Sequence, residues 1–200
     1  MINDTFLTIS SESQGIYREK GSKFLAFAYP VKNEEEVMER LEFLHKKYFD
    51  ARHHCYAYRL GINGEKYRAN DDGEPANSAG KPILGQLTAF GVSNVLVVVV
   101  RYFGGILLGV GGLVHAYKNA TAGALANANI VTDKITETYK ISFDYRDMNK
   151  VLKIVKDMNI ECFGQDFGMN CKMNITVRKS LVEQMKKRFQ TVETLKAINF

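Results

Sequence analysis

The sequence has few cysteines, no long apolar run and no recognisable targeting segment. Its three cysteines are odd in number and form no CxxC pair, which argues against a disulfide framework or a zinc ribbon and favours reduced core thiols. The longest aliphatic run is too short to span a bilayer, and the first ten residues lack the basic start and apolar stretch of a signal peptide. Internal repeats and low-complexity segments are also absent. We therefore expect a globular, cytoplasmic protein without membrane association.

The size and charge of the chain constrain its organisation. With 200 residues, 46% of them apolar, it can bury a sizeable core in one large domain or two small ones. The net charge of +5 is uneven: residues 1–132 carry 14 Lys and Arg against 13 Asp and Glu, whereas residues 133–200 carry 13 against 9. This modest basic excess is compatible with a phosphate backbone as partner, and nothing indicates DNA specificity.

The composition changes near Thr132, after an alanine-rich segment, so we place a boundary between domains at 1–132 and 133–200. Apolar periodicity predicts an α+β protein whose second domain has the ferredoxin-like (βαββαβ) order. Its predicted elements are Tyr139–Tyr145, Asp147–Met158, Ile160–Phe167, Asn170–Val177, Ser180–Phe189 and Thr194–Asn199. In the first domain, strands are predicted at Thr5–Ser10, Gly15–Glu19, Lys23–Val31, His54–Leu60, Lys66–Ala69 and Val95–Val100, and helices at Glu34–Phe49, from Ser78 and at Leu113–Asn129.

The continuous apolar run Val95–Val100 is typical of a strand covered on both faces, and Arg101 ends it. A cation at the end of a buried strand usually lies at the rim of a cleft, where it meets water, a carboxylate or an anionic ligand. Five glycines follow before the next predicted helix, at positions 104, 105, 109, 111 and 112. They allow positive φ and a close approach of the backbone to a partner.

This glycine loop has three interpretations. In the first it is an anion cradle, where Arg101 and the first helix amides bind a phosphate. In the second it is a flat surface on which Tyr102 and Phe103 stack on bases or on a partner protein. In the third its glycines only let the helix pack tightly on the sheet. The loop matches neither a Walker A motif nor GxGxxG.

Three carboxylates, Asp71, Asp72 and Glu74, lie within four residues. Three interpretations remain open for them: ligands of Mg²⁺, partners of Arg101 across a cleft, or members of a solvated turn. Ser78 opens the next predicted helix, where its hydroxyl either caps the helix or orients a ligand.

His53, His54 and Cys55 are consecutive, so on a strand His53 and Cys55 face one way and His54 the other. That geometry argues against one compact three-ligand metal site, and a buried, hydrogen-bonded histidine is the commoner arrangement. Cys55 shows no sign of the activating surroundings that a nucleophilic thiolate needs.

Three segments resemble a known family. Ala51–Gly61 (ARHHCYAYRLG), Asp71–Leu87 (DDGEPANSAGKPILGQL) and Arg101–Tyr117 (RYFGGILLGVGGLVHAY) closely resemble the YigZ/IMPACT family in order and spacing. Asn77 and Ser78 replace the glycine and threonine that are usual there. The resemblance implies that the first domain has the fold of the second domain of ribosomal protein S5, with helices packed on one face of a mixed sheet.

Eukaryotic IMPACT proteins are regulators linked to translational control. The resemblance therefore implies a regulator or binding protein, rather than an enzyme, that acts near the translation apparatus and contacts RNA or a ribosome-associated protein. The expected contact surface comprises His54 at its rim, Asp71, Asp72, Glu74, Ser78, Arg101, Tyr102, Phe103, Gly104, Gly105 and Gly109. The alternative is a Mg²⁺-dependent enzyme acting on a nucleotide or small phosphorylated substrate, with His54 as general base. No other cofactor is expected.

Overall fold

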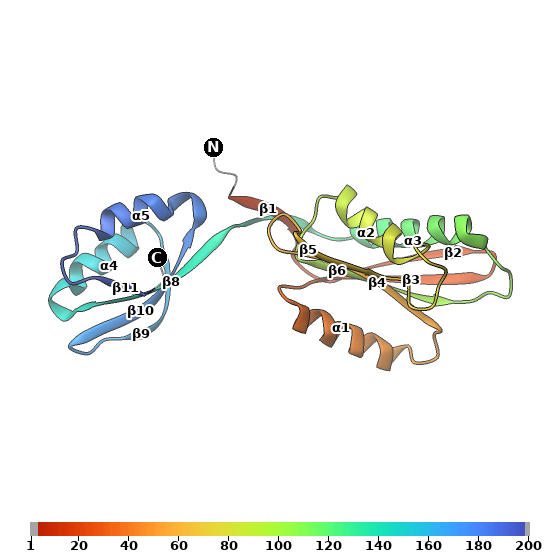
Figure 1. Cartoon of the computed structure of the whole chain (residues 1–200), viewed down its shortest axis with the longest axis horizontal. Helices are drawn as coiled ribbons and strands as arrows, with labels where there is room; N and C mark the ends of the chain where they lie inside the picture. The colour runs from red at the N-terminus through yellow and green to blue at the C-terminus, as the bar shows by residue number, and fades with distance from the viewer. Residues whose placement is uncertain (1–3, 199–200) are drawn as a thin grey trace. The chain divides into compact units, whose positions relative to one another are not determined.

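The computed structural model describes residues 4–198, which form a mixed α+β protein of two compact units. One unit holds Phe6–Asp133, and the other holds the chain from Lys134 onward together with Asp4 and Thr5. Figure 1 shows the elements of each unit. Within residues 4–198, no helix combines the length and apolarity that crossing a bilayer requires.

The Phe6–Asp133 unit is built on a five-stranded sheet in the order β2-β3-β6-β4-β5. Its strands are β2 (Ser13–Glu19), β3 (Ser22–Pro30), β4 (His53–Leu60), β5 (Lys66–Asn70) and β6 (Val95–Tyr102). Three helices accompany them: α1 (Glu34–Lys47), α2 (Gly80–Ala89) and α3 (Gly109–Ala126). All four strand pairings are antiparallel.

The central strand β6 is apolar on both of its faces, as its sequence predicts. Val95, Val97 and Val99 pack in the core under α2 and α3, whereas Leu96, Val98 and Val100 pack in the core against α1. Figure 1 shows α1 on one side of the sheet and the other two helices opposite. The expectation of a mixed sheet with helices on one face is therefore wrong, because two apolar rows on one strand each need cover from water.

The start of α1 agrees with its sequence, whereas the start of α3 does not. Asn33 caps α1, since its side-chain oxygen accepts the Glu36 N–H at 2.9 Å, and the predicted glutamates fill the first turn. Helix α3 begins at Gly109, four residues before the predicted start at Leu113. Glycine has poor helix propensity, so the sequence pattern placed the start of the helix too late.

The second unit contains β8 (Thr136–Asp144), α4 (Met148–Asp157), β9 (Glu161–Asp166), β10 (Asn170–Arg178), α5 (Val182–Phe189) and β11 (Lys196–Ile198). Short 3-10 turns, η1 (Tyr145–Asp147) and η2 (Lys179–Leu181), precede its helices. The strands form an antiparallel sheet in the order β11-β8-β10-β9, and the predicted order of elements is present. Asn199, the predicted end of the last strand, lies outside the described residues.

Two strands at the ends of the first unit pair with each other, apart from the main sheet. They are β1 (Thr5–Ile9) and β7 (Ile130–Lys134). Strand β7 was not predicted from the sequence, because its residues are exposed or half-buried and carry no strong apolar alternation. Before β1, the Asp4 carboxylate accepts hydrogen bonds from Arg178 and Ser180, which explains why Asp4 belongs with the second unit.

Candidate functional site

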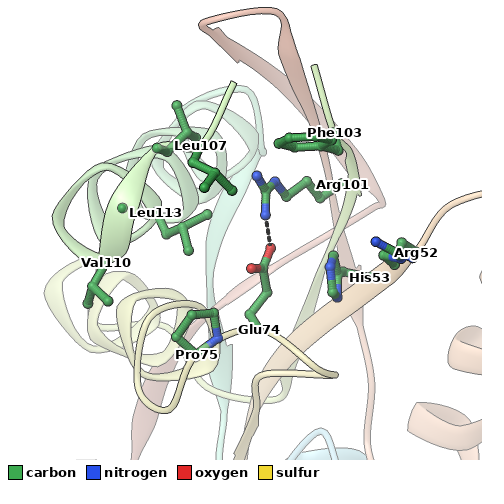
Figure 2. A pocket seen from close by; sticks show the side chains of 11 residues that line it. Arg52, His53, Glu74, Pro75, Arg101, Phe103, Leu107, Val110 and Leu113 are labelled. Carbon is green, nitrogen blue, oxygen red and sulfur yellow. Dashed lines mark hydrogen bonds and ion pairs between the residues drawn. The ribbon is translucent and has the colours of Figure 1, made fainter. Parts of the chain in front are cut away.

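A pocket of about 390 Å³ lies where β6 ends beside the start of α3. It is lined by Arg52, His53, Glu74, Pro75, Arg101, Phe103, Leu107, Leu108, Gly109, Val110 and Leu113. Figure 2 shows the Arg101–Glu74 pair between Leu107, Val110, Leu113 and Pro75 on one side and His53 and Arg52 on the other, with Phe103 beside Arg101. Strand alternation turns Arg101 toward the α2 and α3 side of the sheet, the same side as Val99.

Arg101 and Glu74 form a buried ion pair. Arg101 Nη1 donates to Glu74 Oε1 at 2.6 Å, and the two side chains are only 7% and 3% exposed. The rings of Phe24 and Phe103 lie 5.5 and 5.7 Å from the guanidinium carbon, which adds cation–π contacts. Of the three carboxylates proposed as partners for Arg101, Glu74 is therefore the one that binds it.

The ion pair extends into a hydrogen-bonded chain. The Tyr117 hydroxyl donates to Glu74 Oε1 at 2.7 Å, and the Cys55 thiol lies 3.3 Å from the Tyr117 hydroxyl and donates to the Asp71 carbonyl at 2.9 Å. Burial raises the pKa values of both Cys55 and Tyr117. Cys55 is thus a neutral core thiol and not an activated nucleophile.

The other two carboxylates of the acidic turn organise the backbone. Asp71 accepts N–H groups from Asn77, Ala79 and Gly80 at 2.8, 2.9 and 2.8 Å. Asp72 Oδ2 accepts the backbone N–H of His54 at 2.6 Å. Across residues 4–198, the structure contains no group of three or more His, Cys, Asp or Glu side chains placed to share a metal ion.

Ser78 is fully buried but does not cap α2. Its hydroxyl donates to the Pro75 carbonyl at 2.6 Å, and the helix amides that it was expected to satisfy bind Asp71 instead. A carboxylate satisfies two adjacent helix amides better than one hydroxyl can, which is the physical reason for this correction. The Ser78 hydroxyl therefore closes the turn rather than facing a ligand.

His54 does not lie at the rim of the site. It is 3% exposed, its ring stacks on His45 with centroids 4.0 Å apart, and its Nε2 has no partner among the described residues. The pocket instead contains His53, whose Nδ1 lies 2.8 Å from the Asp72 carbonyl. Strand register is the signal that distinguishes them, since His53 lies directly opposite Arg101 on the neighbouring strand.

The buried ring of His54 predicts a pH-dependent stability. Burial lowers its pKa below 6.5, His45 adds to this effect, and Asp72 opposes it. The unfolded chain therefore binds more protons near pH 6, so the free energy of unfolding falls as the pH drops below about 6.5. Urea unfolding at pH 7, 6 and 5 should show this loss, and His54→Gln should flatten it. An unchanged slope in His54→Gln would assign the loss to other groups.

The two aromatic residues after Arg101, Tyr102 and Phe103, lie on different sides of the sheet. The Tyr102 hydroxyl donates to Asp50 at 2.8 Å, and its ring packs against the core on the α1 side. Tyr102 therefore does not share the pocket, whereas Phe103 lines it and is 52% exposed. Successive strand residues point to opposite faces, so only one of two adjacent aromatics can reach the pocket from β6.

The glycines of the loop have different structural roles. Gly104 packs against Gly21 and Ser22, and its N–H donates to the Ser22 hydroxyl at 3.1 Å. Gly105 and Gly109 have φ values of +87° and +71°, a region that favours glycine. The loop between them exposes Ile106 and Leu107, which are 57% and 83% exposed. The contact surface expected from the sequence did not include these two apolar side chains, because residue type alone does not show which apolar side chains the fold leaves exposed.

Comparisons with known proteins agree with this architecture. The sequence profile of the Impact N-terminal domain matches residues 20–125. The IMPACT family member YvyE of Bacillus subtilis is 35% identical over 151 residues, which are 76% of this chain and 69% of that protein. The IMPACT family member YigZ of Escherichia coli is 33% identical over 150 residues, 74% of each chain. A crystal structure described as a hypothetical protein is 27% identical, with a TM-score of 0.78 over 100% of this chain and 98% of that one.

The family profile covers the strands and helices that build the pocket, from Lys20 to Leu125. The two bacterial relatives extend the likeness over about three quarters of the chain. This protein therefore belongs to the IMPACT family, as its three motifs predicted.

Proposed function

We propose that this protein is a non-enzymatic, cytoplasmic regulator or binding protein of the translation apparatus, which contacts RNA or a ribosome-associated protein. The resemblance to eukaryotic IMPACT proteins, which are linked to translational control, supports the proposed role at the translation apparatus. One observation supports the proposal that the protein acts by binding and not as an enzyme. The carboxylates of Asp71, Asp72 and Glu74 are all engaged by groups of the chain itself, so the motif acts as a scaffold for the surface above it.

The surface above the scaffold supports binding. Ile106, Leu107 and Val110 are 57%, 83% and 56% exposed, and the half-exposed Phe103 lines the same pocket as Leu107 and Val110. Neighbouring large apolar side chains on a soluble domain usually mark an interaction site. In the proposed complex, this apolar patch contacts a partner protein or stacks on bases.

The proposed domains are an S5 domain 2-like domain at 1–132 and a ferredoxin-like domain at 133–200. The strand order β11-β8-β10-β9 and the βαββαβ order of elements support the second assignment. Residues 133–200 carry 13 basic and 9 acidic side chains, a balance that suits nonspecific phosphate contacts by this domain. Such contacts weaken as salt rises because bound counterions are released.

Ribosome co-sedimentation from a lysate at low and high salt tests this function. We expect the wild-type protein to sediment at low salt and Ile106→Asp to sediment about tenfold less, because a carboxylate would enter the apolar contact. Ile16→Asp is the matched control, since Ile16 is 62% exposed on the edge strand β2. No sedimentation in either salt would count against the proposal. A melting-temperature shift with a nucleotide and Mg²⁺ would then favour the enzyme alternative.

A further inference from the structure

We propose that the pocket beside Arg101 binds a small monocarboxylic acid with an apolar body, its carboxylate between Arg101 and the first turn of α3. This ligand site shares Phe103, Leu107 and Val110 with the proposed contact surface, but the argument for it does not depend on that contact. Three features of the pocket carry the proposal: the start of the helix, the free edge of the guanidinium, and the apolar flank.

The start of α3 is open to an anion. The helix is 18 residues long, has no side-chain cap at Leu108 and has no acidic residue in its first turn. No hydrogen bond to another described residue occupies the N–H groups of Gly109, Val110 or Gly111. A helix start with free amides attracts negative charge, and here Gly109 and Val110 line the pocket.

Arg101 supplies the second and independent feature. The residue is only 6% exposed, and Nη1 is taken by Glu74, but Nε is buried and without a partner among the described residues. Figure 2 shows the other terminal nitrogen turned away from Glu74, toward Leu107 and Leu113. The edge formed by Nε and that nitrogen matches the two oxygens of a carboxylate. A ligand there would relieve the cost of an unpaired buried N–H.

The rest of the pocket is apolar. Leu107, Val110 and Leu113 lie on one side of the Arg101–Glu74 pair with Pro75 below them, and Phe103 lies beside Arg101 across from them (Figure 2). A volume of about 390 Å³ lies within the range of small-molecule pockets, about 300 to 1,000 Å³. The space therefore suits a short alkyl or aromatic body next to the charged group.

The charged side chains that line the pocket favour a ligand with a single negative charge. Arg52 and Arg101 contribute two positive charges to the lining, and Glu74 contributes one negative charge. The two arginines and Glu74 together leave one net positive charge, which a single carboxylate balances. A polyphosphate would instead place excess negative charge close to the Glu74 carboxylate. This argument favours a carboxylic acid over a nucleotide.

Titration of the full-length protein with octanoate, followed by the amide signals of Gly105, Gly109, Gly111 and Gly112 in nitrogen-15 NMR, tests the proposal. We expect saturable shifts of these signals, binding of octanol at least tenfold weaker, and no saturable shift with inorganic phosphate. Octanol binding as tight as octanoate would overturn the role of the charge. Phosphate binding as tight as octanoate would overturn the role of the apolar body, and an absence of shifts would overturn the proposal.

Two variants and one control locate the site. Leu107→Ser should weaken octanoate about tenfold, whereas Phe49→Ser should not, although the two side chains are equally exposed at 83% and 84%. Arg101→Lys keeps the charge beside Glu74 but removes the paired N–H edge, and should also weaken binding about tenfold. Equal losses in Leu107→Ser and Phe49→Ser would overturn the site. A peptide with a free C-terminal leucine that binds tighter than octanoate, and loses binding when amidated, would overturn the small-molecule assignment in favour of a protein terminus.

Discussion

Replacing Gly104 with alanine is expected to lower the free energy of unfolding by about 3 kcal/mol or more. A Cβ atom at this position would lie 1.9 Å from the carbonyl carbon of Gly21 and 2.2 Å from the amide nitrogen of Ser22. Both atoms belong to the backbone, so no side-chain rotation relieves the overlap. The loop after β6 would have to separate from the turn between β2 and β3, and the Gly104 hydrogen bond to Ser22 would be lost.

Urea unfolding measures this effect, and Gly111→Ala is the matched control. Gly111 lies in the first turn of α3, and a Cβ atom there meets nothing within 4 Å. Alanine in a helix is more stable than glycine by about 0.5 to 1 kcal/mol, so this variant should be unchanged or slightly stabilised. If Gly104→Ala unfolds at the same urea concentration as Gly111→Ala, the close approach is not required for stability.

Replacing Glu74 with alanine is expected to lower the free energy of unfolding by about 3 to 5 kcal/mol. The change leaves the Arg101 guanidinium buried without its counter-ion and removes the acceptor of the Tyr117 hydroxyl. A charge that is kept out of water and has no partner is far more costly than a broken surface pair. Urea unfolding at neutral pH measures the loss.

Two further variants separate the buried pair from ordinary surface electrostatics. Glu42→Ala breaks a pair with Lys46 in which the side chains are 66% and 75% exposed, and it should cost less than about 1 kcal/mol. The double variant Glu74→Leu/Arg101→Met removes both buried charges and should recover part of the loss seen in Glu74→Ala. Equal effects of Glu74→Ala and Glu42→Ala would show that burial of the pair contributes nothing.

Local patterns in the sequence were sufficient for much of the fold. Six consecutive apolar residues, Val95–Val100, predicted a strand covered on both faces, and both cores do meet there. The Asn33 cap and the glutamates after it predicted the start of α1. These features depend on residues that are neighbours along the chain, so composition and spacing are enough to predict them.

The site was predicted only in outline. The motifs correctly indicated that Arg101 ends a buried strand and that a carboxylate of the acidic turn could meet it. They did not indicate which carboxylate, because Glu74 and Arg101 are 27 residues apart and meet only when β6 and the turn before α2 pack together. Nor did they distinguish Asp71, which accepts hydrogen bonds from backbone amides, from Glu74, which forms the ion pair with Arg101.

The sequence by itself determined the family, the order of the elements apart from β7, and the strand alternation that separates His53 from His54 and Tyr102 from Phe103. Only the tertiary structure decided which member of each pair faces the pocket. Alternation says that adjacent side chains point to opposite faces, but it does not say which face lies under α3. That choice depends on the pairing register and on which helix covers each side of the sheet, and both are set by contacts between distant parts of the chain.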